Sequence, residues 1–155
     1  MAVYLRLYRK IAFSIFMLTG FATPALAQET PVGAWKTIDD ASGKARAIVR
    51  ISESNGALSG KIEKLIHEPG DELNPRCIAC SDARKDQPVL GMTILSGLKR
   101  EGDSMVWSGG EILDPDNGKT YKSKATLTAG GRKLEVRGYL GVPMLGRTQT
   151  WFREP

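Results

Sequence analysis

The chain has 155 residues, and its 22 Lys and Arg residues against 17 Asp and Glu residues give a formal net charge of +5. Three of the basic residues, Arg6, Arg9 and Lys10, lie near the amino terminus, and without them the net charge is only about +2. The remaining chain has no basic stripe interleaved with aromatic residues, which argues against a nucleic-acid-binding protein.

Residues 1–27 have the features of a secretory signal peptide. The three basic residues precede an apolar stretch, Ile11–Phe21, and Ala25-Leu26-Ala27 forms an A-x-A cleavage site before Gln28. The apolar stretch is short for a stable membrane span, and no cysteine follows it for a lipid anchor. We therefore expect residues 1–27 to be removed, with an uncleaved anchor as the alternative. The expected product is one domain, 28–155, which is periplasmic or secreted and does not span a membrane.

From Gly33 onward, segments rich in Val, Ile, Thr, Tyr and Trp alternate with turn signals, a rhythm typical of an all-β fold. The strongest turn signal is Asn55-Gly56, and Gly109-Gly110 predicts a bulge. A long irregular segment, 67–90, separates the third strand from the fourth. The eight expected strands are Gly33–Ile38, Ala45–Ser52, Leu58–Ile66, Gly91–Leu98, Met105–Leu113, Thr120–Thr128, Leu134–Leu140 and Gly146–Arg153.

The two ends of this strand series match. Gly33-Ala34-Trp35 opens the first strand and Trp151-Phe152-Arg153 closes the last one, and pairing them would close the sheet. The sequence thus predicts an eight-stranded antiparallel up-and-down barrel with one long loop between its third and fourth strands. Every second connection then lies at the same end, which gathers the segments Asp39–Gly43, Cys77–Cys80, Asp114–Gly118 and Val142–Leu145.

Strand alternation predicts which side chains face the interior. In 120–128 the uncharged set Tyr121, Ser123, Ala125 and Leu127 should point inward. Taken with the strands at 45–52 and 134–140, the inward side chains are small near the gathered loops and bulky at the other end, with Tyr121 and Leu140 at the rim as exceptions. This taper predicts a cavity that opens beneath the gathered loops and is plugged at the far end.

The Cys77-x-x-Cys80 pair has several interpretations. In an oxidising envelope a disulfide that tightens the long loop is favoured. A redox-active pair usually sits in a βαβ setting that this chain lacks, and half of a zinc site would need two further ligands although His67 is the only histidine. Free thiols are the fourth alternative. We expect no metal and no cofactor.

Candidate catalytic groups are sparse. A serine–histidine triad would require His67, but no Gly-x-Ser-x-Gly segment supplies a nucleophile. Glu111 and Asp114 bracket a strand end and would suit acid–base chemistry if they were buried and close together. Asp residues also stabilise turns through their own backbone, which is the simpler interpretation of Asp114.

The predicted function is a non-enzymatic module that binds a small, largely apolar molecule, with no nucleic-acid partner. We assign Tyr121, Tyr139 and Met144 to the pocket and Arg147 to an acidic head group of the ligand. Two alternatives stay open. One is an envelope interaction or structural protein with a filled barrel, and the other is an enzyme that uses the rim carboxylates.

Four segments of the chain resemble a known family. They are Trp35–Asp40, Cys77–Cys80, Gly110–Pro115 and Gly146–Trp151, and together they are similar to the exported bacterial family called domain of unknown function 2147. Gly33-x-Trp35 also resembles the first strand of lipocalins and other calycins. Trp35, Trp151 and Arg153 belong to the strand ends that close the barrel, and we expect them to have structural roles. The two resemblances imply a lipocalin-like barrel in the cell envelope. They imply no activity and no catalytic residues.

Overall fold

The computed structural model describes residues 30–155, so the predicted signal peptide lies outside the described residues. Strands form almost all of the regular structure, with two single-turn 3-10 helices, η1 (Ala129–Gly131) and η2 (Pro143–Leu145). No helix among these residues is long and apolar enough to cross a membrane. The eight strands are β1 (Gly33–Ile38), β2 (Ala45–Ser54), β3 (Ala57–Leu65), β4 (Thr93–Arg100), β5 (Val106–Asp114), β6 (Lys119–Thr128), β7 (Lys133–Tyr139) and β8 (Arg147–Arg153).

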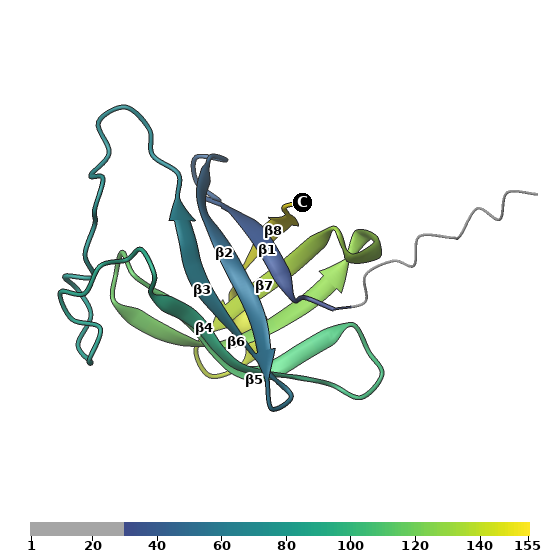
Figure 1. The fold of residues 1–155 in the computed structure, drawn as a ribbon. Helices are drawn as coiled ribbons and strands as arrows, with labels where there is room; N and C mark the ends of the chain where they lie inside the picture. Colours follow the sequence, from purple (N-terminus) through teal and green to yellow (C-terminus); the bar gives the residue numbers. More distant parts are fainter. Residues whose placement is uncertain (1–29) are drawn as a thin grey trace, which may run out of the picture.

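Each strand pairs antiparallel with the next, and β1 pairs with β8, so the sheet closes into a barrel (Figure 1). The closing seam is short and consists of the pairs Trp35↔Arg153 and Lys36↔Phe152. The predicted all-β class, strand number and closure are therefore confirmed. A register shift between Trp107 and Gly110 interrupts the β5–β6 ladder at the predicted bulge.

The largest difference from the predicted strand limits is at β4, which begins at Thr93 instead of Gly91. Gly91 has a positive φ of 84°, which an extended strand does not adopt. The backbone here makes a turn that is fastened to β3. Gly91 N–H donates to the Ile62 carbonyl, and Ile62 N–H donates to the Met92 carbonyl.

The connections divide into two sets. The β1–β2, β3–β4, β5–β6 and β7–β8 connections lie at one end, here called the open end, and the other three lie at the closed end. The long β3–β4 connection, 66–92, extends to one side of the barrel in Figure 1. The predicted gathering of the four segments at one end is thus correct.

Bulky side chains fill the closed half of the barrel. The alternation of β2, β6 and β7 buries the predicted inward residues of this half, including Ile51, Leu127 and Leu134. Leu58, Leu98 and Trp107 join them from the strands between. Because these side chains occupy the interior, the closed end has no room for a ligand.

Trp35 and Arg153 seal the closed end together. Trp35 is fully buried and its indole N–H donates to the Pro31 carbonyl at 2.6 Å. The Arg153 guanidinium lies 4.3 Å from the Trp35 ring and donates to the carbonyls of Gly131, Val32 and Thr30. Partial burial lowers the pKa of Arg153, because the charged form loses hydration. This stack holds the chain before β1 and the η1 turn against the seam.

Candidate ligand-binding site

A cavity of about 950 Å³ occupies the open half of the barrel and extends against the long β3–β4 connection, where Asp71, Pro75 and Arg76 line it. Its deep wall is apolar and is formed by Val49, Ile62, Val136 and Trp151. Ala47 and Gly138 line it nearer the mouth, and their small size leaves the space open. The taper predicted from the inward faces therefore gives a hollow that opens where the four connections gather.

One strand carries polar side chains from the mouth to the floor. The inward residues of β8 are Arg147 at the rim, Gln149 in the middle and Trp151 at the floor, and all three line the cavity. The Trp151 indole N–H donates to Gln149 Oε1 at 3.3 Å. This bond uses the side-chain oxygen of Gln149 and not its amide nitrogen. The two amide N–H groups in the middle of the cavity can therefore donate to a guest.

Two of the ion pairs at the rim include residues that line the cavity. Arg147 Nε is 2.6 Å from Asp40 Oδ2, which connects β8 to the β1–β2 turn. Arg46 Nη2 is 3.4 Å from Asp116 Oδ2, which connects β2 to the β5–β6 turn. Since β2 and β6 are four strands apart in the closed sheet, the second pair reaches across the mouth. Both pairs are largely exposed to solvent, so their contribution to stability is small.

Two carboxylates of the rim are engaged in turns. Asp39 accepts hydrogen bonds from the backbone and hydroxyl of Ser42, and these bonds lower the pKa of Asp39. Asp114 accepts from the Asp116 backbone N–H and from the Asn117 side-chain amide. The turn interpretation of Asp114 is therefore the one that its contacts support.

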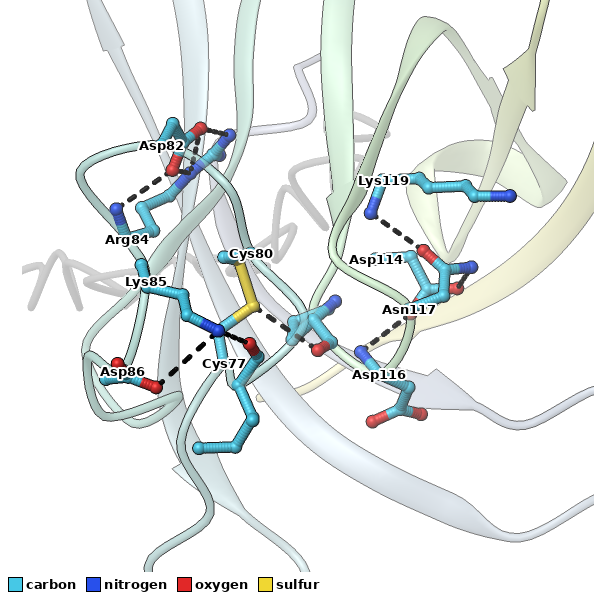
Figure 2. Close-up of a disulfide and its surroundings, with 12 residues drawn as sticks. Cys77, Cys80, Asp82, Arg84, Lys85, Asp86, Asp114, Asp116, Asn117 and Lys119 are labelled. Atoms are coloured by element: carbon cyan, nitrogen blue, oxygen red, sulfur yellow. Dashed lines mark hydrogen bonds and ion pairs between the residues drawn. A yellow bond between two sulfur atoms is a disulfide. The ribbon is translucent and has the colours of Figure 1, made fainter.

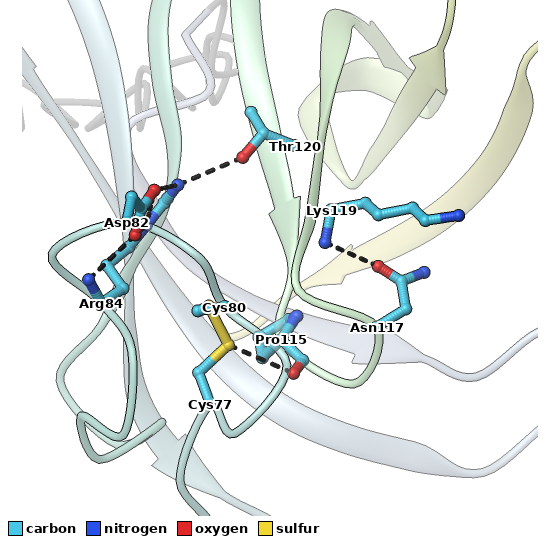
Figure 3. Close-up of polar contacts among 8 residues, drawn as sticks. All are labelled: Cys77, Cys80, Asp82, Arg84, Pro115, Asn117, Lys119 and Thr120. Atoms are coloured by element: carbon cyan, nitrogen blue, oxygen red, sulfur yellow. Dashed lines mark hydrogen bonds and ion pairs between the residues drawn. A yellow bond between two sulfur atoms is a disulfide. The ribbon is translucent and has the colours of Figure 1, made fainter.

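The cysteines are joined in a Cys77–Cys80 disulfide, with a Cα–Cα distance of 5.4 Å, as the favoured interpretation predicted. Both cysteines are buried, and Figure 2 shows the disulfide between them. Cys77 Sγ lies 3.4 Å from the Pro115 carbonyl oxygen (Figure 3). A Cβ on Gly118 would lie 2.1 Å from the Ala79 carbonyl oxygen, so glycine alone permits this approach. The disulfide loop thus packs directly on the β5–β6 turn.

A second contact fastens the long loop to the same hairpin. Arg84 Nη2 donates to Thr120 Oγ1 at 3.1 Å, and its Nε donates to both oxygens of Asp82 (Figure 3). The Arg84 guanidinium, together with the Arg84 backbone N–H, lowers the pKa of Asp82 to about 2. The loop and the β5–β6 turn consequently form one side of the mouth, where Ile78, Ala79 and Pro115 line the cavity.

The four residues assigned to ligand binding lie in different positions. Tyr121 faces inward and its hydroxyl is 3.2 Å from Asn117 Nδ2. Tyr139 borders the cavity, but it follows the inward Gly138 and pairs with Lys122 across the outer face. Arg147 lies at the rim. Met144 is 87% exposed and its neighbour Leu145 lines the cavity in its place, so the binding role of Met144 stays a prediction.

The two carboxylates considered for catalysis are not brought together in the cavity. Glu111 is exposed on the outer face of β5 and does not line it, whereas Asp114 does. His67 borders the mouth on the long loop. No group of three metal-ligating side chains occurs within residues 30–155.

Sequence reasoning missed Gln149 and the contact of Arg46 with Asp116 as parts of this site. Side chains alternate between the two faces of a strand, so Gln149 faces inward with Arg147 and Trp151. This alternation in β8 would have been enough to predict its position. The Arg46–Asp116 contact had no such signal, because it joins residues from opposite sides of the barrel.

Comparisons with known proteins agree with this architecture. The family described as uncharacterized protein conserved in bacteria (DUF2147) matches residues 33–153, and the chain belongs to that family. Among solved structures, the chain is similar to protein HP1028 from Helicobacter pylori, which is described as belonging to the lipocalin family. The two chains are 22% identical with a TM-score of 0.69, over 81% of this chain and 84% of the other. No protein with a curated description matches the chain.

Proposed function

We propose that the protein is an exported carrier that holds a small, largely apolar molecule in its barrel, with an acidic group of that molecule at Arg147. The observation that carries this proposal is the cavity of about 950 Å³, which has an apolar floor and a cationic side chain at its rim. A guest of this kind buries its apolar body against Val49, Val136 and Trp151. Burial of apolar surface supplies most of the binding free energy, and the polar groups orient the guest.

Arg147 is suited to an acidic group although it already pairs with Asp40. Of the three guanidinium nitrogens of Arg147, only Nε has a hydrogen-bond partner within residues 30–155. The two terminal nitrogens remain available for a carboxylate. The side chain is 66% exposed, so it can turn toward a guest without leaving a buried charge unpaired. Gln149 below it offers further donors.

Two further arguments support the carrier. The likeness to a lipocalin-family protein concerns the fold, and a closed eight-stranded barrel is a fold that commonly encloses one small ligand. The amino-terminal pattern, with basic residues, an apolar stretch and Ala25-Leu26-Ala27, supports export to the periplasm or beyond.

Trp151 provides the test, because it lines the cavity floor whereas Trp35 and Trp107 do not. The purified protein is titrated with dodecanoic acid and with dodecanol while tryptophan fluorescence is recorded. We expect a saturable change with both, with the acid bound more tightly. Arg147→Gln should abolish the preference for the acid, and Arg132→Gln at the closed end should keep it.

Three outcomes would contradict the proposal. Absence of any saturable change would favour the interaction protein over the carrier. An unchanged signal in Trp151→Phe would place the bound molecule outside the cavity. An acid preference that survives Arg147→Gln would remove the assigned role of this residue.

A further inference from the structure

Exposed apolar side chains gather on one connection of the barrel. Leu140, Val142, Met144 and Leu145 are between 53% and 87% exposed and belong to the β7–β8 connection, 140–146, here called the apolar loop. Ile78 is 61% exposed on the other lip of the same mouth. Exposed apolar groups this concentrated on a small protein mark a surface that is covered by something else.

The apolar loop is ordered by its own contacts. Leu145 N–H donates to the Val142 carbonyl, and Gly146 N–H donates to the Pro143 carbonyl. Arg137 donates from Nε to the Pro143 carbonyl at 2.6 Å and from Nη2 to the Met144 carbonyl at 3.2 Å. The carbonyls of this turn are therefore satisfied from within the protein. These bonds lower the cost of bringing the Val142, Pro143 and Met144 carbonyls into an apolar phase.

The loop is also held close to the barrel. A Cβ on Gly146 would lie 2.5 Å from the Gly138 carbonyl oxygen and 2.7 Å from Tyr139 Cβ. The chain therefore doubles back tightly on the end of β7. The apolar side chains project from a fixed base, so little conformational entropy is lost when they are covered.

Basic side chains lie directly beneath this loop on the outer wall. Lys124 and Arg137 are opposite each other in the β6–β7 ladder, and Lys122 is opposite Tyr139. These three basic residues, here called the cationic collar, face one carboxylate from the next strand, that of Glu111 opposite Lys122. The half-buried Tyr139 stands between the collar and the loop. An apolar tip above an aromatic residue and several cations is the pattern of a protein that rests on a lipid surface.

The acidic side chains of the rim set the orientation. Asp39 and Asp40 belong to the β1–β2 turn, and Asp114 and Asp116 to the β5–β6 turn. Because Asp40 pairs with Arg147 and Asp116 with Arg46, the cations of the rim are neutralised, and the rim attracts an anionic surface less than the collar does. The barrel would instead lean on its β6–β7 wall, with the apolar loop inserted and the mouth beside the lipid.

We propose that the apolar loop and the cationic collar form a docking surface for a lipid bilayer that carries anionic headgroups. The loop side chains enter the boundary between headgroups and acyl chains, and the two lysines of the collar contact lipid phosphates. This surface does not depend on the carrier function, because neither Val142 nor Met144 lines the cavity. If both hold, an apolar guest passes between bilayer and barrel at the adjoining mouth.

Cosedimentation with vesicles tests the proposal. The protein from Gln28 onward contains the whole barrel, and its use avoids lipid binding by the apolar leader. We expect it to bind vesicles with about one third anionic lipid at least about tenfold more strongly than neutral vesicles at low salt. Binding should weaken as the salt concentration rises, because salt screens the collar.

Two double variants separate the parts of the surface. Val142→Ser with Met144→Ser should reduce binding to anionic vesicles at least about tenfold by removing the inserted side chains. Lys122→Glu with Lys124→Glu should reduce it about as much and remove the salt dependence. Matched controls are Leu90→Ser and Lys99→Glu, which change an exposed leucine and an exposed lysine elsewhere on the barrel and should bind as the parent does.

Each opposite result overturns the proposal. It fails if the parent protein stays in the supernatant with anionic vesicles, which would leave the apolar loop to a protein partner. It fails equally if the two double variants bind as well as Leu90→Ser and Lys99→Glu do. Far-ultraviolet circular dichroism of every variant shows that a loss of binding is not a loss of fold.

Discussion

At the scale of single residues, the stack of Arg153 on Trp35 explains how the closed end is sealed. Trp35 has no exposed surface, and its ring lies under the guanidinium at 4.3 Å. The three carbonyls that accept from Arg153 come from the chain before β1 and from the η1 turn. Arg153 thus holds Val32 and Thr30, which precede it by 121 and 123 residues in the sequence, against the end of β8.

Replacing Trp35 with Ala should lower the free energy of unfolding by about 3–5 kcal/mol, since it removes a large buried aromatic side chain. Urea unfolding followed by circular dichroism measures this loss. Arg147→Ala at the open rim serves as the comparison and should change stability by less than about 1 kcal/mol. The assignment of the two ends would be wrong if Arg147→Ala were the more damaging change.

Asp82 provides a prediction about pH at the same scale. Its folded pKa of about 2 lies below the usual aspartate value of 3.8, so its contribution to stability is present above about pH 4 and is lost as the pH falls toward 2. Carboxyl-carbon NMR titration should give a pKa near 2 for Asp82 in the parent protein. Arg84→Ala keeps the backbone N–H, so it should raise that pKa part of the way toward 3.8, and an unchanged value would show that the Arg84 guanidinium is not a cause.

At the scale of elements, the mouth has one braced side. The disulfide loop and the β5–β6 turn contact each other through Gly118, and Arg84 adds a bond from the long loop to Thr120. The exposed Arg46–Asp116 ion pair connects this braced side of the mouth to β2. A weak exposed ion pair across the mouth can open at little cost, whereas the braced side should keep its shape when a guest enters.

Gly118→Ala tests the contact between the disulfide loop and the β5–β6 turn. Gly118 has a positive φ of 69°, and an added methyl group would also overlap the Ala79 carbonyl. Gly43→Ala is a matched control, because Gly43 has a φ of 70° and nothing within 4 Å of the added Cβ. Both variants bear the backbone strain, but Gly118→Ala should lose about 1–3 kcal/mol more.

Reduction of the disulfide gives a second readout of the same contact. We expect dithiothreitol to reduce Cys77–Cys80 faster in Gly118→Ala than in Gly43→Ala, because separation of the loop from the turn exposes the sulfurs. Alkylation of the freed thiols followed by mass measurement gives the rates. Equal stability and equal reduction rates in the two variants would mean that the close approach at Gly118 is not needed.

Much of the fold could be predicted at this scale. Alternation within β2, β6 and β7 identified the inward faces, and turn residues such as Asn55-Gly56 marked where strands end. The site was less accessible to such reasoning. The period of β8 places Gln149 inward, but the Arg46–Asp116 contact depends on how two distant connections fold over the mouth. The position of Met144 depends on the η2 turn, which directs Leu145 to the cavity instead.

At the scale of the whole molecule, the two halves of the barrel have different tasks. The closed half is filled by bulky side chains and carries the seam between β1 and β8, so it supplies stability. The open half is hollow because small residues such as Ala47 and Gly138 face inward there. A barrel divided in this way can bind a guest without disturbing the part that keeps it folded.

Export of the whole molecule is a separate prediction. If residues 1–27 are a signal peptide, protein recovered from its own host should begin at Gln28 and lie outside the cytoplasm. Amino-terminal sequencing and cell fractionation check both statements. A start at Met1 together with recovery from the membrane fraction would instead show an uncleaved anchor.

Native mass spectrometry of protein purified from its own host tests the carrier account most directly. The parent protein should carry a discrete extra mass of a small molecule, released under denaturing conditions. Ala47→Trp fills the open half from an inward position of β2 and should remove that mass while circular dichroism shows an intact barrel. The account is contradicted if the parent protein carries no extra mass, or if folded Ala47→Trp retains the same bound molecule.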